Sequence, residues 1–417
     1  MNTLSWTVQG ETARRKREES LPLPESLGEF VRDQAALRGD QIAAVWFDQN
    51  CSLSYTELDQ RASALAHSLM ALGVRKGTHV AMMLGNGPAF PLTWIALGRL
   101  GAIMVPVNTA YTVDEINFVL TDSDAQFLVI DDDLLERIDA LPTLPPLLDR
   151  SRIIVNAKGN GSSGAVDAQS GAPANALSHI AEGQDAPLSW NDLVQSGDPD
   201  FVSPFPVNRN DLLNLQYTSG TTGFPKGCML SHDYWMIHSH NSARHRRTAA
   251  GGVKNVLIWA PFFYMDPMWQ FLMTLRVGGT AYIADRMSLT RFMSWLIDYQ
   301  IHYCIFPEPA ISHYPPSERD AQVSLKYISI YGWTESARRA VQTRFNVVAR
   351  EGFGMTEIGT GALVPDWDDE RALARTCGLP AAFRELEVRR DDGSPAPDGE
   401  VGELWVRGRG LFWGYYK

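Results

Sequence analysis

Residues 217–227 read Tyr-Thr-Ser-Gly-Thr-Thr-Gly-Phe-Pro-Lys-Gly. This segment follows a short apolar run at residues 212–215 and precedes a segment that predicts a helix from Ser231 onward. Glycines let a backbone approach an anion closely, while the hydroxyls add donors and Lys226 adds a positive charge. The segment therefore predicts a phosphate-binding loop, with a flexible Ser/Thr/Gly turn as the alternative. It is not the ordinary P-loop, because Gly227 stands where Ser or Thr should follow the lysine.

A second motif lies at residues 351–357, which read Glu-Gly-Phe-Gly-Met-Thr-Glu. Its glycines let the backbone approach a ligand, Phe353 can stack on a purine, and Thr356 can donate to a phosphate. Glu357 can hold Mg²⁺, which usually takes one or two carboxylates together with phosphate oxygens and water. The alternative is that the Thr-Glu pair caps a helix. The motif therefore predicts a site for a nucleotide and its metal ion.

The two motifs, in this order, resemble those of the acyl-adenylate-forming superfamily. That superfamily includes the acyl-CoA ligases, the adenylation domains of peptide synthetases and the luciferases. Further similarity lies in scaffold segments at residues 72–77, 101–108, 402–408 and 414–415. Three positions depart from the usual pattern: Tyr264 stands where His is common, Trp333 follows Gly332 where a small residue is usual, and Phe353 replaces Tyr.

The resemblance implies that a carboxylate attacks ATP to form acyl-AMP, and that a thiol, most often CoA, then takes the acyl group. The implied catalytic residues are Thr218, Lys226, Thr356 and Glu357, with Glu357 as the Mg²⁺ ligand. The implied ATP-binding residues are Thr218, Ser219, Gly220, Thr221, Thr222, Gly223, Lys226, Gly332, Trp333, Glu351, Gly352, Phe353, Gly354, Met355 and Thr356. The implied acid-binding residues are Trp235, Tyr264, Trp269 and Gly332. The rings of Trp235, Tyr264, Trp269 and Trp333 suggest an aromatic or bulky apolar acid, although core packing explains tryptophans as well.

Two further hypotheses stay open. In one, the acyl group passes to a carrier protein instead of CoA. In the other, the chain is a binding module that holds a preformed adenylate without chemistry of its own. Pyrophosphate exchange separates the binding module from both enzymes, and detection of the thioester separates the two acceptors.

Length and composition narrow the number of packed units, the kinds of partner and the compartment that we expect for this chain. The chain has 417 residues, which suggests two to three packed units. The net charge of −11 argues against a nucleic-acid partner, and no apolar run reaches the length needed to span a bilayer. The four cysteines lie far apart, which is typical of free thiols in a reducing cytosol, so we expect a cytoplasmic protein. A dimer is one option for its oligomeric state.

Short apolar strands alternate with helices along most of the chain, which predicts an α/β fold of layered parallel sheets. We expect two similar β/α halves and a small C-terminal subdomain like a β-barrel. The predicted divisions are a frayed, solvated tail at 1–25, a first α/β subdomain at 26–200 and a second at 201–370 with the ATP-binding motifs, followed by a β-rich subdomain at 371–417. Residues 158–187, dominated by Gly, Ser, Ala and Asn, predict a flexible excursion.

Histidines and arginines cluster at residues 238–247. His238 and His240 are two residues apart and so lie on different faces of the predicted helix. This spacing favours a solvated face, or a lid over an anionic ligand, rather than a metal site.

Relatives in the superfamily continue beyond the region that corresponds to Lys417, with a small lid domain that carries a catalytic lysine. We expect that domain to be absent here, by deliberate truncation rather than as a natural short form. A chain of this kind is expected to bind ATP or the acyl-adenylate but to adenylate poorly.

Overall fold

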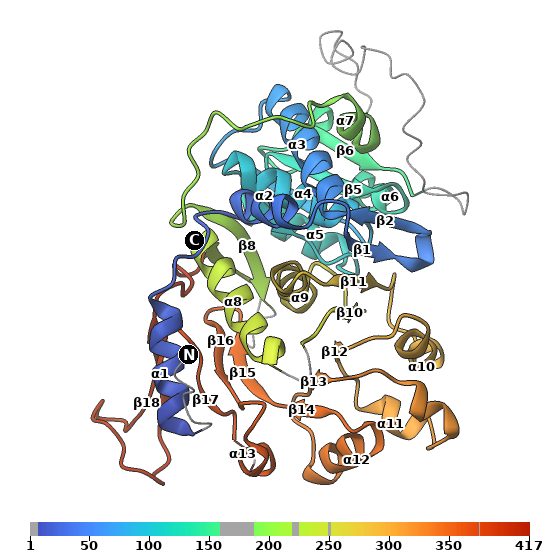
Figure 1. The fold of residues 1–417 in the computed structure, drawn as a ribbon. Helices are drawn as coiled ribbons and strands as arrows, with labels where there is room; N and C mark the ends of the chain where they lie inside the picture. The colour runs from blue at the N-terminus through green and yellow to red at the C-terminus, as the bar shows by residue number, and fades with distance from the viewer. Residues whose placement is uncertain (1–6, 159–186, 219–224, 249–251, 375) are drawn as a thin grey trace. The chain divides into compact units, whose positions relative to one another are not determined.

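The computed structural model describes residues 7–158, 187–218, 225–248, 252–374 and 376–417 (Figure 1). The chain divides into two compact units. The larger unit comprises Pro24–His232, Ile258–Met287 and Trp413–Lys417, and the smaller comprises Met1–Leu23, Asp233–Leu257 and Ser288–Phe412. Of the excursion predicted at residues 158–187, residues 159–186 lie outside the described residues.

The larger unit is built on a seven-stranded sheet in the order β7-β6-β5-β3-β4-β8-β9. Its strands are β3 (His79–Met83), β4 (Ile103–Pro106), β5 (Phe127–Asp131), β6 (Ile153–Asn156), β7 (Leu188–Ser189), β8 (Leu212–Thr218) and β9 (Lys226–Ser231). All neighbouring pairs are parallel except β8 and β9, which are antiparallel. Strand β3 is central because the chain moves to β4 on one side of it and then crosses back to β5 on the other.

Because crossover connections between parallel strands are right-handed, a connection to one neighbour and a connection to the other place their helices on opposite faces of the sheet. The reversal at β3 therefore gives helices on both faces. Helices of this unit are α2 (Leu27–Arg38), α3 (Tyr55–Ala71), α4 (Ala89–Leu100), α5 (Val113–Asp122), α6 (Leu135–Asp139), α7 (Trp190–Ser196) and α9 (Met265–Val277). The indole Nε1 of Trp190 in α7 donates to Thr93 Oγ1 in α4 (2.9 Å). A continuous buried core joins alternate sheet residues to Ile116, Val119 and Leu120 of α5 and to Ile138 of α6.

Local sequence signals set where these helices begin. Ser54 and Glu57 form a capping box at the start of α3, and Thr112 and Glu115 form another at the start of α5. In each box two backbone N–H groups that lack helical partners are satisfied by side chains.

The larger unit also contains β1 (Ile42–Trp46), β2 (Cys51–Ser54) and β11 (Thr280–Ile283). Strand β1 pairs with β2 in antiparallel and with β11 in parallel register. Short 3₁₀ turns occupy Phe47–Gln49, Asp132–Leu134 and Arg150–Arg152.

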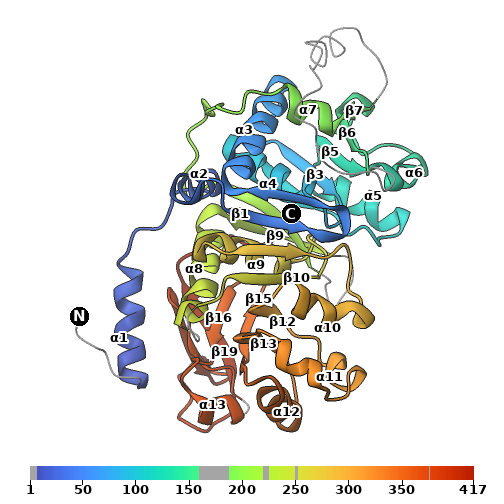
Figure 2. The same cartoon turned by 45° about the vertical axis from the view of Figure 1, so that its right-hand side comes forward.

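The smaller unit contains a parallel run of strands in the order β14-β13-β12-β10. These are β10 (Asn255–Ile258), whose last residue belongs to the larger unit, β12 (Tyr303–Ile305), β13 (Tyr327–Ser329) and β14 (Val348–Arg350). Its helices are α1 (Val8–Glu19), α8 (His232–Thr248), α10 (Leu289–Asp298), α11 (Pro309–His313), α12 (Glu335–Phe345) and α13 (Asp369–Leu373), with a 3₁₀ turn at Glu318–Gln322. Figure 2 shows α10, α11 and α12 along one side of this unit.

Antiparallel strands complete the smaller unit. Strands β15 (Gly352–Met355), β16 (Gly359–Leu363) and β17 (Leu379–Pro380) form one small sheet, and β18 (Arg384–Arg389) pairs with β19 (Glu403–Gly408) in another. The predicted α/β class, with parallel strands in two halves, is confirmed.

The expectation of a frayed N-terminal tail is wrong for residues 8–19, which form helix α1. Arg244 of α8 explains the difference. Its guanidinium lies 2.7 Å from the Glu11 carboxylate and 2.6 Å from that of Glu18. The backbone N–H of Phe383 also donates to Glu19 (2.8 Å). Charges that looked solvated in the sequence therefore find partners more than 200 residues away.

Candidate functional site

The first motif lies on a β-hairpin in the larger unit. Strands β8 and β9 pair in antiparallel register, and Thr218 at the end of β8 is opposite Lys226 at the start of β9. Ser219, Gly220, Thr221, Thr222 and Gly223 lie outside the described residues. The loop therefore joins two paired strands, and the helix α8 begins only at the end of the second strand. Strand β9 was not predicted from the sequence.

The side chain of Lys226 lies over an aromatic ring. Its Nζ is 5.1 Å from the centroid of Tyr415, within the range of a cation–π interaction. Tyr415 belongs to residues 413–417, which run along β9: Trp413 N donates to Met229 O (2.9 Å), and Tyr416 N donates to Gly227 O (2.8 Å). The last residues of the chain thus bring an aromatic ring to the proposed phosphate-binding lysine.

Tyr217, the first residue of the motif, is anchored away from the loop. Its hydroxyl donates to Asp122 of α5 (2.7 Å), and burial, together with this carboxylate, raises the pKa of the phenol above its ordinary value. The phenol is therefore a neutral donor that fixes the end of β8.

Asn86 connects three loops at the carboxyl end of β3. Its Nδ2 donates to the carbonyls of Ala260 (3.0 Å) and Ala284 (2.8 Å), and its Oδ1 accepts from Phe262 N (2.9 Å). The side chain is only 5% exposed. It holds the segment that continues into Tyr264.

The segment with Tyr264 carries two of the residues predicted to contact the acid. Gln216 of β8 donates to Phe263 O (2.9 Å), which ties this segment to the sheet. The Tyr264 side chain is exposed, and its hydroxyl lies 3.4 Å from Asn108 Nδ2. Trp269, in contrast, is buried in α9, and its indole nitrogen donates to Asp266 (2.9 Å).

The second motif forms strand β15 and the turn into β16, in the smaller unit. The two strands pair closely: a Cβ at Gly354 would lie 2.6 Å from the carbonyl oxygen of Gly359. The pairing within the chain thus requires this glycine, independently of any ligand. Met355, the last residue of β15, is half exposed. Beyond the strand, Thr356 and Glu357 are partly buried, and Phe412 N donates to Glu357 O (2.9 Å).

Glu351 joins this motif to Gly332. One carboxylate oxygen accepts from Gly332 N (2.9 Å), and the other accepts from Arg338 Nη2 (2.6 Å). Gly332 has a φ angle of +70°, a backbone conformation that residues other than glycine rarely adopt. The neighbouring Trp333 is 6% exposed, and its ring packs edge-to-face on Phe306, with centroids 6.0 Å apart.

Trp235 and the histidines lie on α8. Trp235 is fully buried, with its ring centroid 6.2 Å from that of His238. His238 Nδ1 accepts from Thr360 N (3.1 Å), so it anchors β16. His240 lies 3.5 Å from the Glu18 carboxylate. Within the part of the chain that the structure describes, no three His, Cys, Asp or Glu side chains are grouped as a metal would require.

Glu357 is nonetheless suited to a nucleotide-bound Mg²⁺. Such an ion needs only one or two protein carboxylates, because phosphate oxygens and water complete its octahedron. Glu357 supplies a partly buried carboxylate and the preceding Thr356 a hydroxyl, which fits that donor set.

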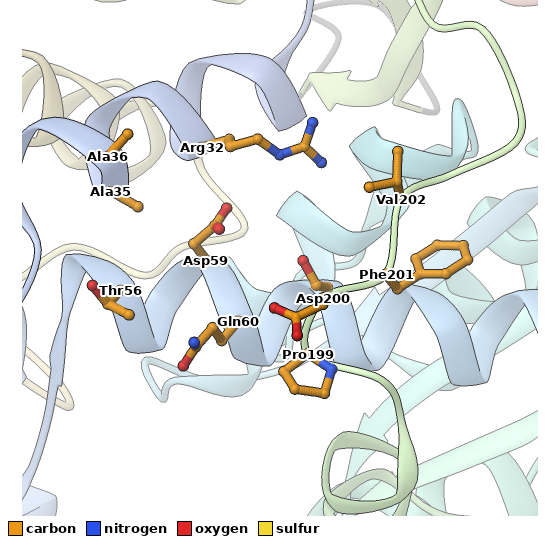
Figure 3. Close-up of a pocket in the computed structure, with 11 residues that line it drawn as sticks. Arg32, Ala35, Ala36, Thr56, Asp59, Gln60, Pro199, Asp200, Phe201 and Val202 are labelled. Atoms are coloured by element: carbon orange, nitrogen blue, oxygen red, sulfur yellow. The ribbon is translucent and has the colours of Figure 1, made fainter.

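A pocket of about 320 Å³ lies elsewhere in the larger unit, between α2, α3 and the segment after α7 (Figure 3). Its lining combines charged residues with apolar ones: Arg32, Asp59 and Asp200 with Ala35, Ala36, Pro199, Phe201 and Val202. Asp59 is ion-paired with the buried Arg99. None of the residues predicted for ATP or the acid lines this pocket.

Comparison with known proteins assigns the chain that carries these motifs to a family. Residues 31–416 match the profile described as "AMP-binding enzyme". The chain belongs to this family. Helix α1 lies outside the matched residues of this AMP-binding enzyme. The superfamily predicted from the two motifs is therefore confirmed.

Curated relatives of this AMP-binding enzyme include proteins named as CoA synthases and CoA ligases. A feruloyl-CoA synthase of an Amycolatopsis species is 29% identical over 371 residues, covering 88% of this chain and 67% of that protein. A crotonobetaine/carnitine–CoA ligase of Proteus mirabilis is 25% identical, covering 87% and 67% respectively.

Solved structures share the fold. The N-terminal domain of FACL13 from Mycobacterium tuberculosis superposes with a TM-score of 0.77 at 21% identity, covering 94% of this chain and 91% of that one. The anthranilate CoA ligase AuaEII, solved with anthranoyl-AMP, gives 0.79 at 20% identity, covering 95% and 72%. In the described residues, no helix is long and apolar enough to cross a membrane.

Sequence reasoning missed three residues that organise these segments: Asn86, Arg338 and Tyr415. Asn86 and Arg338 were not singled out from the sequence. Tyr415 was interpreted as scaffold. Local patterns could not single them out, since their partners are distant in sequence or on another element.

Proposed function

We propose that this AMP-binding enzyme activates a carboxylic acid with ATP and belongs to an acid–thiol ligase that transfers the acyl group to CoA. In the first step an oxygen of the acid bonds to the α-phosphorus, and pyrophosphate leaves with the electron pair of the broken P–O bond. In the second step the CoA thiolate attacks the acyl carbon and AMP leaves.

The observation that carries the proposal is the family match over nearly the whole chain, with both nucleotide motifs in the matched region. The relatives add support for CoA as the acceptor, because their names are those of CoA synthases and ligases. No feature of the described residues favours a carrier protein.

The chemistry needs charge neutralisation and positioning more than proton transfer. Lys226 is proposed to hold the departing phosphates as a point charge, with Thr218 and the loop hydroxyls as donors. Thr356 is proposed to donate to the α-phosphate. Gly332 and Phe353 are proposed to contact the base, and Tyr264 the acid.

Glu357 is proposed to hold Mg²⁺, which when bound offsets the charge of the phosphates. The protein's own contribution at this point is the position of the carboxylate on the β15–β16 turn.

The test is ATP–pyrophosphate exchange against a panel of aromatic, aliphatic and cationic carboxylic acids, followed by detection of the acyl-CoA by mass spectrometry. Loss of one charged transition-state contact costs on the order of 10²–10³ in rate. We therefore expect Lys226→Met and Glu357→Gln to reduce exchange by about that factor. Glu335→Gln, which alters an exposed pair with Arg339, is the matched control and should leave exchange unchanged.

The outcomes separate the alternatives. Exchange together with formation of acyl-CoA supports the proposal. Exchange with a thioester found only on a carrier protein would show that the carrier protein, and not CoA, accepts the acyl group. Because this chain is expected to adenylate poorly, slow exchange still supports the proposal. Binding of a non-hydrolysable acyl-adenylate analogue with no detectable exchange for any acid would indicate a binding module. Absence of binding to both ATP and the analogue would refute the proposal.

A further inference from the structure

Arg338 is a buried cation that the roles proposed so far do not use. It lies in the first turns of α12, only 2% exposed. Its Nη2 donates to Glu351 (2.6 Å), and the other oxygen of that carboxylate accepts from Gly332 N (2.9 Å). One carboxylate is thus held by two donors, a guanidinium on one oxygen and a backbone amide on the other.

This arrangement joins the ends of two neighbouring strands. Strands β13 and β14 are parallel, with Ser329 opposite Arg350. Gly332 follows the first strand by three residues, and Glu351 follows the second immediately. The carboxylate therefore cross-links two loops at the carboxyl edge of the sheet, where ligands bind in open α/β folds.

The residues that meet at this cross-link differ in exposure. Gly332 and the preceding Tyr331 are exposed, Tyr331 by 49%. Arg338, the other partner of Glu351, is buried. The guanidinium can therefore reach a ligand only through Glu351, which makes it a candidate for positioning rather than contact.

Stability alone is a weak reason for this ion pair. Burying a charge costs several kcal/mol, and well-packed apolar residues often replace a buried pair without loss. The Nε of Arg338 has no hydrogen-bond partner among the described residues, so the site is not fully satisfied. What the pair does provide is a fixed direction for both Glu351 oxygens.

We propose that Arg338 is a positioning residue for nucleotide recognition: it orients the Glu351 carboxylate, and through it the Gly332 loop, toward the purine. This inference rests on the proposed function. A carboxylate so held has lone pairs left to accept from an exocyclic amino group, and it repels the carbonyl that replaces that group in hypoxanthine. Arg338 therefore governs preference for ATP over ITP.

The experiment compares the dissociation constants of ATP and ITP for the wild-type chain, Arg338→Met, Arg338→Lys and Glu351→Gln. We expect Arg338→Met to weaken ATP binding about tenfold, as loss of a charged hydrogen bond does, with little effect on ITP. The ATP/ITP ratio should then fall about tenfold. Arg338→Lys keeps one charged donor and should restore part of the ratio.

The adjacent Arg339 provides a matched control. It is on the same helix, exposed, and paired with Glu335 one turn away. Arg339→Gln should leave the ratio unchanged, and thermal unfolding of each variant reports any general loss of stability. A merely structural role would lower the melting temperature and both affinities together, without changing their ratio.

An ATP/ITP ratio in Arg338→Met within twofold of wild type would overturn the inference. If that variant does not fold, Arg338→Lys and Glu351→Gln carry the test, and unchanged ratios in both overturn it equally. Failure of the proposed function is distinct, because the wild-type chain would then bind neither nucleotide.

Discussion

His232 should remain uncharged down to about pH 5, although an ordinary histidine is half protonated near pH 6.5. It is fully buried at the start of α8, and its Nδ1 accepts from Leu27 N (3.0 Å). An acceptor nitrogen cannot carry a proton, and burial disfavours the charged ring. Burial lowers the pKa of His232 to about 4, against an opposing effect of Asp211 and a small further lowering by Lys76.

The magnitude follows from linkage between protonation and folding. The unfolded chain takes up a proton near pH 6.5, whereas the folded chain does so only near pH 4, so the unfolded state binds more protons between these values. Stability is therefore complete above about pH 6.5 and is lost as the pH falls. At about 1.4 kcal/mol per pKa unit, the loss by pH 4 is about 3 kcal/mol.

The perturbation is His232→Asn, which keeps an acceptor near Nδ1 but does not titrate. We expect this variant to be less stable at neutral pH, because the smaller side chain leaves a cavity, and to lose less stability than wild type between pH 6.5 and pH 4.5. The assay is denaturant unfolding at a series of pH values, and the difference between the two proteins isolates this residue.

His313→Asn, at an exposed position, serves as the control and should keep the wild-type dependence on pH. Histidine-labelled NMR gives the pKa directly, since His232→Asn identifies the resonance. A midpoint near 6.5, or equal pH slopes for wild type and His232→Asn, would refute the reasoning.

Three other outcomes are expected. Asn86→Ala removes three buried hydrogen bonds and should lower the free energy of unfolding by about 3 kcal/mol in denaturant titrations; a loss under about 1 kcal/mol would contradict its role as a connector. Tyr415→Leu removes the ring beneath Lys226 and should weaken ATP binding about two- to fivefold, on the order of one cation–π contact. Calorimetry measures the affinity, and Tyr415→Phe, which keeps the ring, should keep the wild-type affinity. Arg244→Met removes the cation that Glu11 and Glu18 share, although Glu11 keeps Arg14 as a partner. Helix α1 should therefore become more accessible to limited proteolysis, and protection equal to wild type would show that the helix does not depend on Arg244.

The sequence predicted the parts of this protein that depend on neighbours along the chain. Alternating apolar strands and helices predicted the α/β class, and the two motifs predicted the family, because glycine turns, capping residues and apolar runs act over a few residues. It did not predict helix α1, whose acidic residues looked solvated until Arg244 of α8 supplied their partner. It also missed strand β9, since pairing with β8 decides its conformation.

In the candidate site, too, some features depend on neighbours along the chain and others on contacts between distant residues. The sequence alone predicts Lys226, Thr356 and Glu357 as site residues, because each stands inside a motif whose chemistry is local. Only the tertiary structure decided which distant groups hold the motifs in place. A ring from the last residues of the chain lies beside Lys226, and a buried arginine and the Gly332 amide share the Glu351 carboxylate. These contacts join separate elements, and their energies depend on burial and direction, which a linear pattern does not contain.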